Sequence, residues 1–210
     1  MRNNPLAKLS LMKNWLCVSC QLKKMYALNN HIGNIYYTDS IWGEKIMIEI
    51  YENLYIGNQN DFESLESKNN YYIVQACKEP YHRNALRYTG RGAPKDHPEY
   101  FVARRGNRLI CNLVDSPDPS FIPDIIISEA LNFIDDHLKE CHKVLVHCNQ
   151  GMSRSAVIGL LYLKEIGIIN GSFCDAEKHF LSIYPLYNPG HGMREYANNN
   201  WDTNFLRENQ

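Results

Sequence analysis

The stretch Lys143–Ser155, KVLVHCNQGMSRS, constrains this chain of 210 residues more than any other part of it. Val144, Leu145 and Val146 form a short apolar run, which predicts a buried strand. A polar loop follows, and the apolar-periodic segment 156–163 then predicts a helix. A strand, a tight loop and a helix N-terminus together form an anion-binding site, because loop N–H groups and the helix dipole converge on one point. The stretch therefore predicts a site for a tetrahedral oxyanion.

The residue types in this loop indicate a nucleophile placed against that oxyanion. Cys148 lies at the mouth of the positive field, which favours a thiolate nucleophile. Arg154 follows six residues later, and its planar guanidinium can hold two oxygens of one phosphate. Gly151 permits a close approach and a positive φ. We expect Ser155 to donate a hydrogen bond to the sulfur, which eases its departure from a phosphocysteine, and His147 to orient the loop from the strand.

The motif HCNQGMSRS resembles the signature loop of cysteine-dependent protein tyrosine phosphatases, in its dual-specificity form. NLYIGNQNDF (53–62) is similar to the strand-turn-helix that opens those domains, and EALNFIDDHL (129–138) to the helix before the signature strand. NPGHGMREY (188–196) is similar to the turn before their last helix. The resemblance covers about residues 46–207 and implies that the phosphate is bound by Arg154 together with Asn149, Gln150, Gly151, Met152 and Ser153.

The architecture that follows is an α/β domain with a central, mostly parallel sheet, helices on both faces, and the site at the carboxyl end of the strands. Hydrophobic pattern and turn residues predict strands at 46–51, 54–56, 71–76 and 143–147, and a hairpin of 101–104 with 108–113. Helices are expected at 61–67, 123–141, 153–165, 175–183 (capped by Asp175) and 192–207.

The reaction needs an acid, because an alkoxide leaves poorly unless it is protonated. Two carboxylates lie in the turn-rich segment Asp-Ser-Pro-Asp-Pro that follows the hairpin, at Asp115 and Asp118. The resemblance places the general acid at Asp115, and Asp118 is chemically equivalent, so both stay open. The acid precedes the cysteine loop, as in the dual-specificity class, whereas low-molecular-weight tyrosine phosphatases have the reverse order.

Two further residues enter through the resemblance. Cys77 ends the predicted strand 71–76, and in the family the loop after this strand lies beside the active site. The plain interpretation is a small buried thiol. The alternative is a partner that protects oxidised Cys148 by forming a disulfide. Asn188 is expected, by analogy with the family, to support the signature loop through hydrogen bonds.

The first 45 residues are interpreted as an extension of unknown role before a catalytic domain at 46–210. They contain Cys17 and Cys20 in a C-x-x-C pattern, but a second ligand pair is missing and only His31 lies nearby. We therefore expect no metal there, and the predicted catalysis needs no cofactor. The start of the chain has no clean signal-peptide core, since Lys8 and Lys13 interrupt it.

The net charge and the cysteine content of the chain indicate which binding partners and which cellular compartment to expect. A net charge of −1 gives the protein no overall electrostatic attraction to nucleic acid or membranes. The sequence contains no run of eighteen apolar residues, so no membrane-spanning helix is predicted. Seven cysteines, one of them a predicted thiolate, favour a reducing cytoplasm. The oligomeric state is left open. One segment, 81–108, is locally basic; its arginines Arg83, Arg87 and Arg91 either form ordinary solvated surface or help gather an anionic substrate.

Three functions are compatible with these residues. The first is hydrolysis of phosphotyrosine, and also of phosphoserine or phosphothreonine, in proteins. The second keeps the chemistry but acts on a phosphoinositide, nucleotide or RNA 5′-phosphate. The basic segment favours the second function, whereas the uncharged Asn149, Gln150 and Met152 disfavour it. The third, a phosphate-binding module without turnover, is disfavoured by the intact set of Cys148, Arg154, Ser155 and Asp115.

Overall fold

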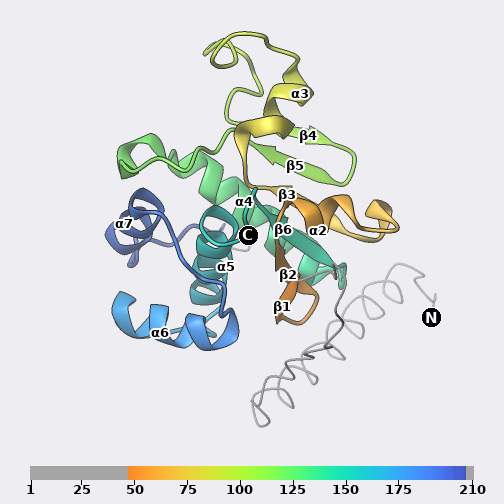
Figure 1. The fold of residues 1–210 in the computed structure, drawn as a ribbon. Helices are drawn as coiled ribbons and strands as arrows, with labels where there is room; N and C mark the ends of the chain where they lie inside the picture. Colours follow the sequence, from red (N-terminus) through yellow and green to blue (C-terminus); the bar gives the residue numbers. More distant parts are fainter. Residues whose placement is uncertain (1–46, 207–210) are drawn as a thin grey trace, which may run out of the picture. The chain divides into compact units, whose positions relative to one another are not determined.

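A six-stranded mixed sheet forms the centre of the computed structural model, which describes residues 47–206 (Figure 1). The spatial order is β1-β2-β6-β3-β5-β4. The inner strands β2, β6, β3 and β5 run parallel, and β1 and β4 pair antiparallel at the edges. This confirms the predicted α/β class. The strands are β1 (Ile48–Tyr51), β2 (Leu54–Gly57), β3 (Tyr72–Gln75), β4 (Val102–Arg105), β5 (Arg108–Cys111) and β6 (Val144–His147).

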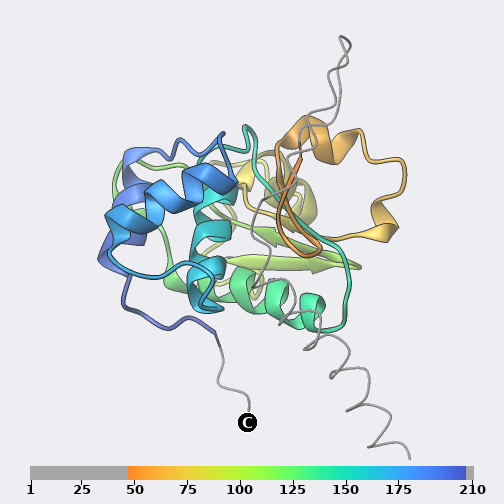
Figure 2. The same ribbon diagram turned by 90° about the horizontal axis from the view of Figure 1, so that it is seen from below.

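Both faces of the sheet are covered, as the alternation of side chains shows. Val144 and Val146 of β6 pack into the large core with α4 (Asp124–Lys139) and α5 (Arg154–Glu165). Leu145, between them, points to the opposite face and packs against Phe62 of α2 (Gln59–Glu63). Figure 2 shows α2 and α4 on opposite sides of the strands. All four residues of β6 are therefore buried, as expected for a central parallel strand.

Two more helices enclose α5 from outside, α6 (Phe173–Ile183) and α7 (His191–Asn199) (Figure 1). Short helical segments that the sequence pattern did not predict are Lys68–Asn70, Lys78–His82, α3 (Arg83–Leu86) and Pro119–Phe121. The predicted loop at 88–98 is present. The hairpin is also confirmed, with Gly106 at φ 59° in the turn between β4 and β5.

Three predicted helix boundaries were wrong. The helix expected at 61–67 begins at Gln59 and ends at Glu63, because Asn58 and Asp61 form a capping box before it. Asp175 does not cap α6; Ser172 does, and its hydroxyl accepts a hydrogen bond from the Asp175 N–H. The last helix ends at Asn199 rather than at 207, since consecutive asparagines support a helix poorly.

No helix within residues 47–206 has the length and apolar character needed to cross a membrane. The predicted extension at 1–45, including Cys17 and Cys20, lies outside the described residues.

Candidate active site

The thiol of Cys148 lies directly after β6, at the middle of the carboxyl edge of the sheet, and is fully buried. Its Sγ accepts a hydrogen bond from the Gly151 N–H at 3.2 Å and from the Ser155 hydroxyl at 3.3 Å. Ser155 is therefore placed where the sequence predicted a donor to the sulfur.

Tyr184 at the end of α6 contacts the same loop carbonyl as Ser155. The Ser155 Oγ lies 3.2 Å from the Gly151 carbonyl oxygen as well as near the sulfur, and it has one proton to donate. The Tyr184 hydroxyl donates to the same carbonyl oxygen at 2.9 Å. Burial, and then the neighbouring Cys148 charge, raise the pKa of Tyr184, so the phenol remains a donor. Tyr184 therefore supports the Gly151 carbonyl, while the Ser155 hydroxyl lies within hydrogen-bond distance of both that carbonyl and the Cys148 sulfur. No local signal in the sequence identified Tyr184.

Gly151 has a φ of 80°, in the region that favours glycine, as expected. A Cβ at this position would lie 3.1 Å from the carbonyl oxygen of Gly57, so the close approach is to the β2–α2 turn. The same turn supports the loop through Gln59, whose N–H donates to the Asn149 carbonyl oxygen at 3.3 Å. The backbone of the loop is thus held from the strand side by a segment almost a hundred residues earlier.

Arg154 begins α5, and its guanidinium is almost buried, with 11% of the side chain exposed. Nη2 donates to Asn149 Oδ1 at 2.8 Å and Nη1 to the Leu113 carbonyl oxygen at 3.3 Å. Nε is buried without a hydrogen-bond acceptor, and lies 3.6 Å from Asp115 Oδ2. A buried donor without an acceptor is costly, and an incoming oxyanion is the natural partner for it.

Backbone donors of the loop are also free. Among the described residues, no acceptor contacts the N–H groups of Gln150, Met152 and Ser153. Successive loop N–H groups and the N-terminus of α5 form a concave anion site. The predicted phosphate-binding residues 149–154 therefore form one continuous loop. Several of its N–H groups have no acceptor among the described residues.

Asp115 lies at this site, and Asp118 does not. Oδ1 of Asp115 accepts a hydrogen bond from the Ser153 hydroxyl at 3.0 Å, and Oδ2 faces Arg154. Asp118 is exposed and caps the short helix Pro119–Phe121 by accepting from the Ser120 N–H. That hydrogen bond lowers the pKa of Asp118, which makes it a poor proton donor.

The segment before α7 closes over the acid loop. The Gly190 N–H donates to the Ser153 hydroxyl at 3.0 Å, and a Cβ on Gly190 would lie 2.8 Å from Asp115 Oδ1. His191 Nδ1 lies 3.1 Å from the Pro117 carbonyl oxygen. Asn188 contacts the signature loop through its backbone, since its N–H donates to the Met152 carbonyl oxygen at 3.0 Å.

His147 is buried on the opposite face of the sheet from α5. Its ring stacks on Phe62 at 4.6 Å, and Tyr81 contacts it edge-on at 5.1 Å. The amide nitrogen of Gln75 lies 3.4 Å from Nε2. Burial lowers the pKa of His147 to about 3, so the imidazole is neutral and adds no charge to the site.

Cys77 is a buried free thiol at the end of β3, next to β6 in the sheet. Burial raises its pKa to about 12; the Arg154 charge opposes that shift and the Cys148 charge adds to it. The thiol is thus close enough to both residues to sense their charges. In its resting state it is unreactive.

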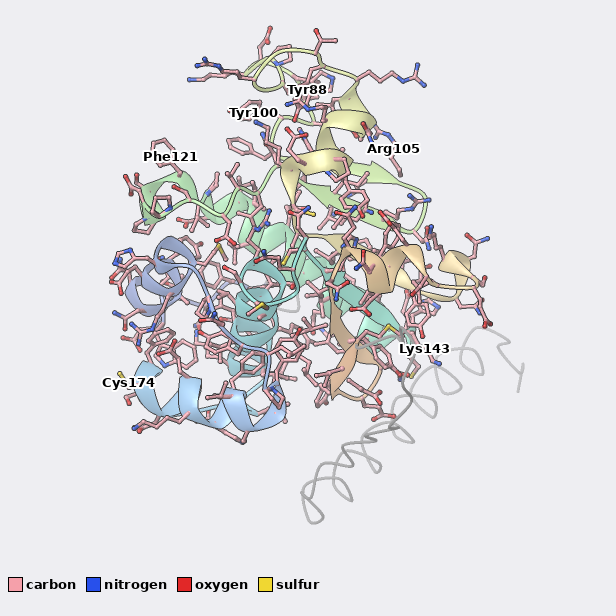
Figure 3. All side chains as sticks on the ribbon, in the orientation of Figure 1. Tyr88, Tyr100, Arg105, Phe121, Lys143 and Cys174 are labelled. Atoms are coloured by element: carbon pink, nitrogen blue, oxygen red, sulfur yellow. The ribbon has the colours of Figure 1, made fainter. Side chains whose placement is uncertain are left out.

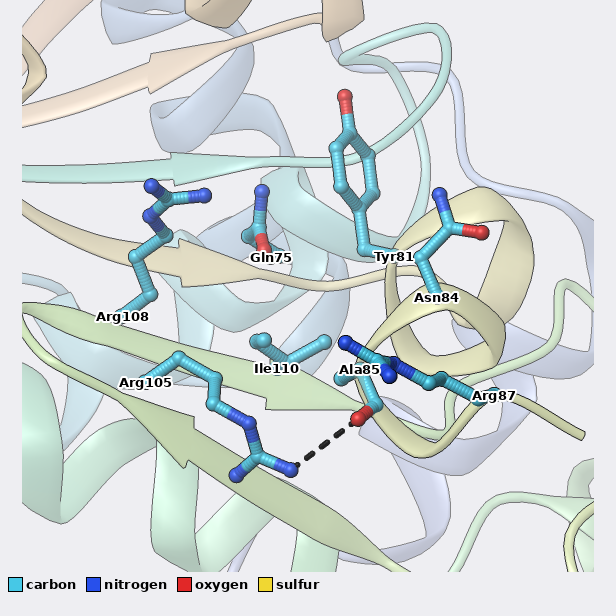
Figure 4. Close-up of a pocket in the computed structure, with 8 residues that line it drawn as sticks. All are labelled: Gln75, Tyr81, Asn84, Ala85, Arg87, Arg105, Arg108 and Ile110. Atoms are coloured by element: carbon cyan, nitrogen blue, oxygen red, sulfur yellow. Dashed lines mark hydrogen bonds between the residues drawn. The ribbon is translucent and has the colours of Figure 1, made fainter.

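The basic segment 81–108 is divided between structural and unpaired arginines. Arg83 binds both oxygens of Glu79 and donates to the carbonyls of Tyr88 and Gly90, so its guanidinium is engaged in holding the loop. A pocket of about 390 Å³ is lined by Gln75 together with Arg87, Arg105 and Arg108, and Figure 4 shows how these side chains lie.

Comparison with known proteins agrees with this site. The sequence model described as "Dual specificity phosphatase, catalytic domain" matches residues 98–169, which include Asp115, Cys148 and Arg154. Dual specificity protein phosphatase 1 of Arabidopsis thaliana is 32% identical over 98 residues. That match covers 46% of this chain and 44% of the plant protein, so this chain spans less than half the length of its curated relative.

Solved structures share the fold. The DUSP15 crystal structure matches with a TM-score of 0.54 at 20% identity, covering 76% of this chain and 89% of that one. Human DUSP28 matches with a TM-score of 0.52 at 15% identity, covering 75% and 93%. Human tyrosine phosphatase-like serine/threonine/tyrosine-interacting protein matches with a TM-score of 0.51 at 19% identity, covering 76% and 97%. Residues 98–169 therefore match the dual-specificity phosphatase catalytic domain in sequence, and the described residues share the fold of these solved structures.

Proposed function

We propose that this domain hydrolyses phosphomonoesters through a phosphocysteine intermediate on Cys148. The observation that carries the proposal is the set of donors without acceptors around the thiol: the buried Nε of Arg154 and the N–H groups of the loop. A dianionic phosphate would satisfy these donors at one position. The thiol already accepts two hydrogen bonds, from the Gly151 N–H and the Ser155 hydroxyl.

The first step forms the S–P bond and breaks the P–O bond to the leaving group. Sγ of Cys148 attacks phosphorus, and Arg154 binds two of the phosphoryl oxygens as their charge grows. Asp115 donates a proton to the departing oxygen, which otherwise leaves as an unstable alkoxide. The 3.6 Å contact between Arg154 and Asp115 implies that the phosphate replaces this carboxylate beside Nε.

The second step returns the enzyme to its starting state. Asp115, now ionised, accepts a proton from a water molecule whose oxygen attacks phosphorus. The S–P bond breaks, inorganic phosphate forms, and the electron pair returns to the sulfur. The hydroxyl of Ser155, which lies 3.3 Å from the sulfur, stabilises the departing thiolate.

We extend the proposal to phosphotyrosine, and to phosphoserine or phosphothreonine, in protein substrates. Support comes from the relatives, whose names describe dual-specificity protein phosphatases. A catalytic thiolate stays reduced in a reducing compartment. On that ground we propose that the protein acts in the cytoplasm.

One observation favours a second candidate, a substrate with another anionic group, such as a phosphoinositide or nucleotide. The pocket in Figure 4 lies next to Gln75, and the Nε of Arg108 there is buried without a hydrogen-bond acceptor. Of the other two arginines, Arg105 is neutralised by Glu99 at 2.7 Å. A net positive charge therefore remains in this pocket.

Hydrolysis of an aryl phosphate tests the mechanism. Cys148→Ser should abolish turnover while inorganic phosphate still binds, because an alcohol cannot replace the thiolate. Arg154→Lys should be nearly as damaging, since a point charge cannot copy the bidentate contact. Substantial turnover in Cys148→Ser would refute the covalent mechanism.

A substrate panel separates the two candidates. Phosphopeptides should be hydrolysed with higher kcat/KM than soluble phosphoinositides or nucleotides, and Arg108→Gln should leave the phosphopeptide rates unchanged. The second candidate predicts the opposite preference, with KM for the polyanionic substrate rising in Arg108→Gln.

A further inference from the structure

The end of α4 brings two histidines and a glutamate together, at the opposite end of β6 from the active site. His142 precedes the first residues of β6, whereas Cys148 follows its last residue. Lys143, the neighbour of His142, is labelled in Figure 3 far from Tyr88 and Tyr100 of the basic segment. This group therefore belongs to neither the catalytic loop nor the arginine-lined pocket.

The backbone at the helix end positions the two imidazoles. The His142 N–H donates to the His137 carbonyl oxygen at 3.0 Å, and the Cys141 N–H donates to that of Leu138 at 2.9 Å. Cys141 adopts the left-handed conformation, with φ 61°. This is the Schellman motif, in which the residues at the positions of His137 and His142 usually make an apolar contact. Here those positions hold imidazole rings, with centroids 5.9 Å apart.

Neither imidazole has its hydrogen bonds satisfied. Nδ1 of His137 and Nδ1 of His142 are both buried and have no hydrogen-bond partner. Oε2 of Glu140 lies 4.0 Å from the first and 3.4 Å from the second, and the three ligand atoms all lie within 4.8 Å of one another. Buried polar atoms in a folded protein normally have partners, so two orphaned nitrogens beside one carboxylate require an explanation.

Aromatic side chains hold the rings in this arrangement. Tyr72 stacks on His137 at 3.5 Å and lies 4.7 Å from His142, and Phe133 contacts His137 edge-on at 4.4 Å. Burial lowers the pKa of His137, which favours the neutral imidazole that binds metals. The two nitrogen donors are thus pre-oriented, while Glu140, with 65% of its side chain exposed, is free to adjust.

We propose that His137, Glu140 and His142 bind one divalent transition-metal ion, and that Zn²⁺ suits the site best. Two imidazole nitrogens and one carboxylate oxygen form a known three-ligand zinc set, whereas Ca²⁺ and Mg²⁺ prefer oxygen ligands. Bonds of about 2.0–2.2 Å in a tetrahedral geometry place the ligand atoms about 3.4 Å apart. Only a small closing movement separates the observed positions from that geometry. The bound ion would fasten the end of α4 to the start of β6.

Zinc binding to the full-length chain tests the site. For this test the chain is prepared with Cys17→Ser, Cys20→Ser and Cys148→Ser, because thiolates are ligands that zinc favours and would compete in the assay. Competition with a chromophoric chelator should then show one equivalent of bound Zn²⁺. At a hundredfold excess over Kd, the melting temperature should rise by about 5–10 °C.

Substitutions of the three proposed ligands test whether the bound Zn²⁺ is held by this cluster. His137→Ala and His142→Ala should each abolish binding and the rise in melting temperature. Glu140→Gln should weaken binding by more than the roughly 10–100-fold that loss of an outer-shell contact costs. His179→Ala, an exposed histidine on α6, is the matched control and should bind zinc like its parent.

A Co²⁺ spectrum gives a second readout that does not depend on a variant folding well. Co²⁺ in the parent chain should show the visible absorption of a four-coordinate site without thiolate charge-transfer bands, and Cys141→Ser should leave the spectrum unchanged. Retention of the metal in both histidine variants, thiolate bands in the spectrum, or no binding at all would each overturn the proposal. In the last case, the cluster is only a histidine–glutamate ion pair.

Discussion

The hydroxyl of Ser153 donates a hydrogen bond to Oδ1 of Asp115 at 3.0 Å, and it receives one from the N–H of Gly190. Because its oxygen is occupied by the Gly190 donor, its single proton points to the carboxylate. This hydrogen bond fixes the position of the carboxylate. Ser153 therefore links the phosphate loop, the acid loop and the segment before α7.

Loss of this hydroxyl should impair proton donation by Asp115. In Ser153→Ala, kcat should fall more for a tyrosine-like leaving group than for a nitrophenol, because only the first needs a well-positioned proton donor. The comparison uses a series of aryl phosphates at one pH. Ser116→Ala removes a hydroxyl from the same loop that contacts Asp118 instead, and it should leave the leaving-group dependence unchanged. Equal changes in both variants would contradict this link.

The two acidic candidates should differ in their response to the leaving group. Asp115→Asn should slow kcat by ~10²–10⁴-fold for a tyrosine-like leaving group, and far less for a nitrophenol that needs no proton. It should also flatten the basic limb of the pH–rate profile. Asp118→Asn should leave both features intact, because this side chain caps a short helix. A leaving-group dependence that changes only in Asp118→Asn would reverse the assignment.

His147 should make the domain less stable in mild acid. Its pKa is about 3 in the folded chain and about 6.5 when unfolded, so between these values only the unfolded chain takes up the proton. Stability is fully present above pH 6.5 and falls as the pH decreases toward 3. At pH 5 the loss is about 2 kcal/mol.

Urea denaturation at several pH values measures this loss. His147→Gln should show a smaller fall between pH 7 and pH 5 than the wild type, whatever its stability at pH 7. His179→Ala, an exposed histidine, serves as the comparison and should follow the wild type. Parallel curves for wild type and His147→Gln would show that another group dominates.

Oxidation tests the predicted role of Cys77. Mild peroxide should inactivate the enzyme reversibly, with a Cys148–Cys77 disulfide detected by mass spectrometry. In Cys77→Ser, the same treatment should become irreversible as Cys148 proceeds to the sulfinic acid. Cys174→Ser, an exposed thiol, is the control and should recover like the wild type. Full recovery of Cys77→Ser by reductant would remove this role.

Local pattern alone predicted the part of the site that is contiguous in the chain. The apolar run before Cys148, the glycine at positive φ and the periodic helix after Arg154 are short-range features, because backbone conformation depends on near neighbours. The β4–β5 hairpin was predictable for the same reason. The wrong boundaries fall at helix ends, where a single capping residue such as Ser172 decides the start.

Tertiary structure decided which distant side chains meet. Asp115 and Asp118 are equivalent in sequence, and only the packing of the segment containing Gly190 against the loop places Asp115 beside Ser153. Tyr184 likewise reaches Gly151 from a separate helix, and no periodicity reports such a contact. Local sequence specifies strands, helices and turns, whereas the choice among equivalent groups depends on burial and hydrogen bonds between elements far apart in the chain.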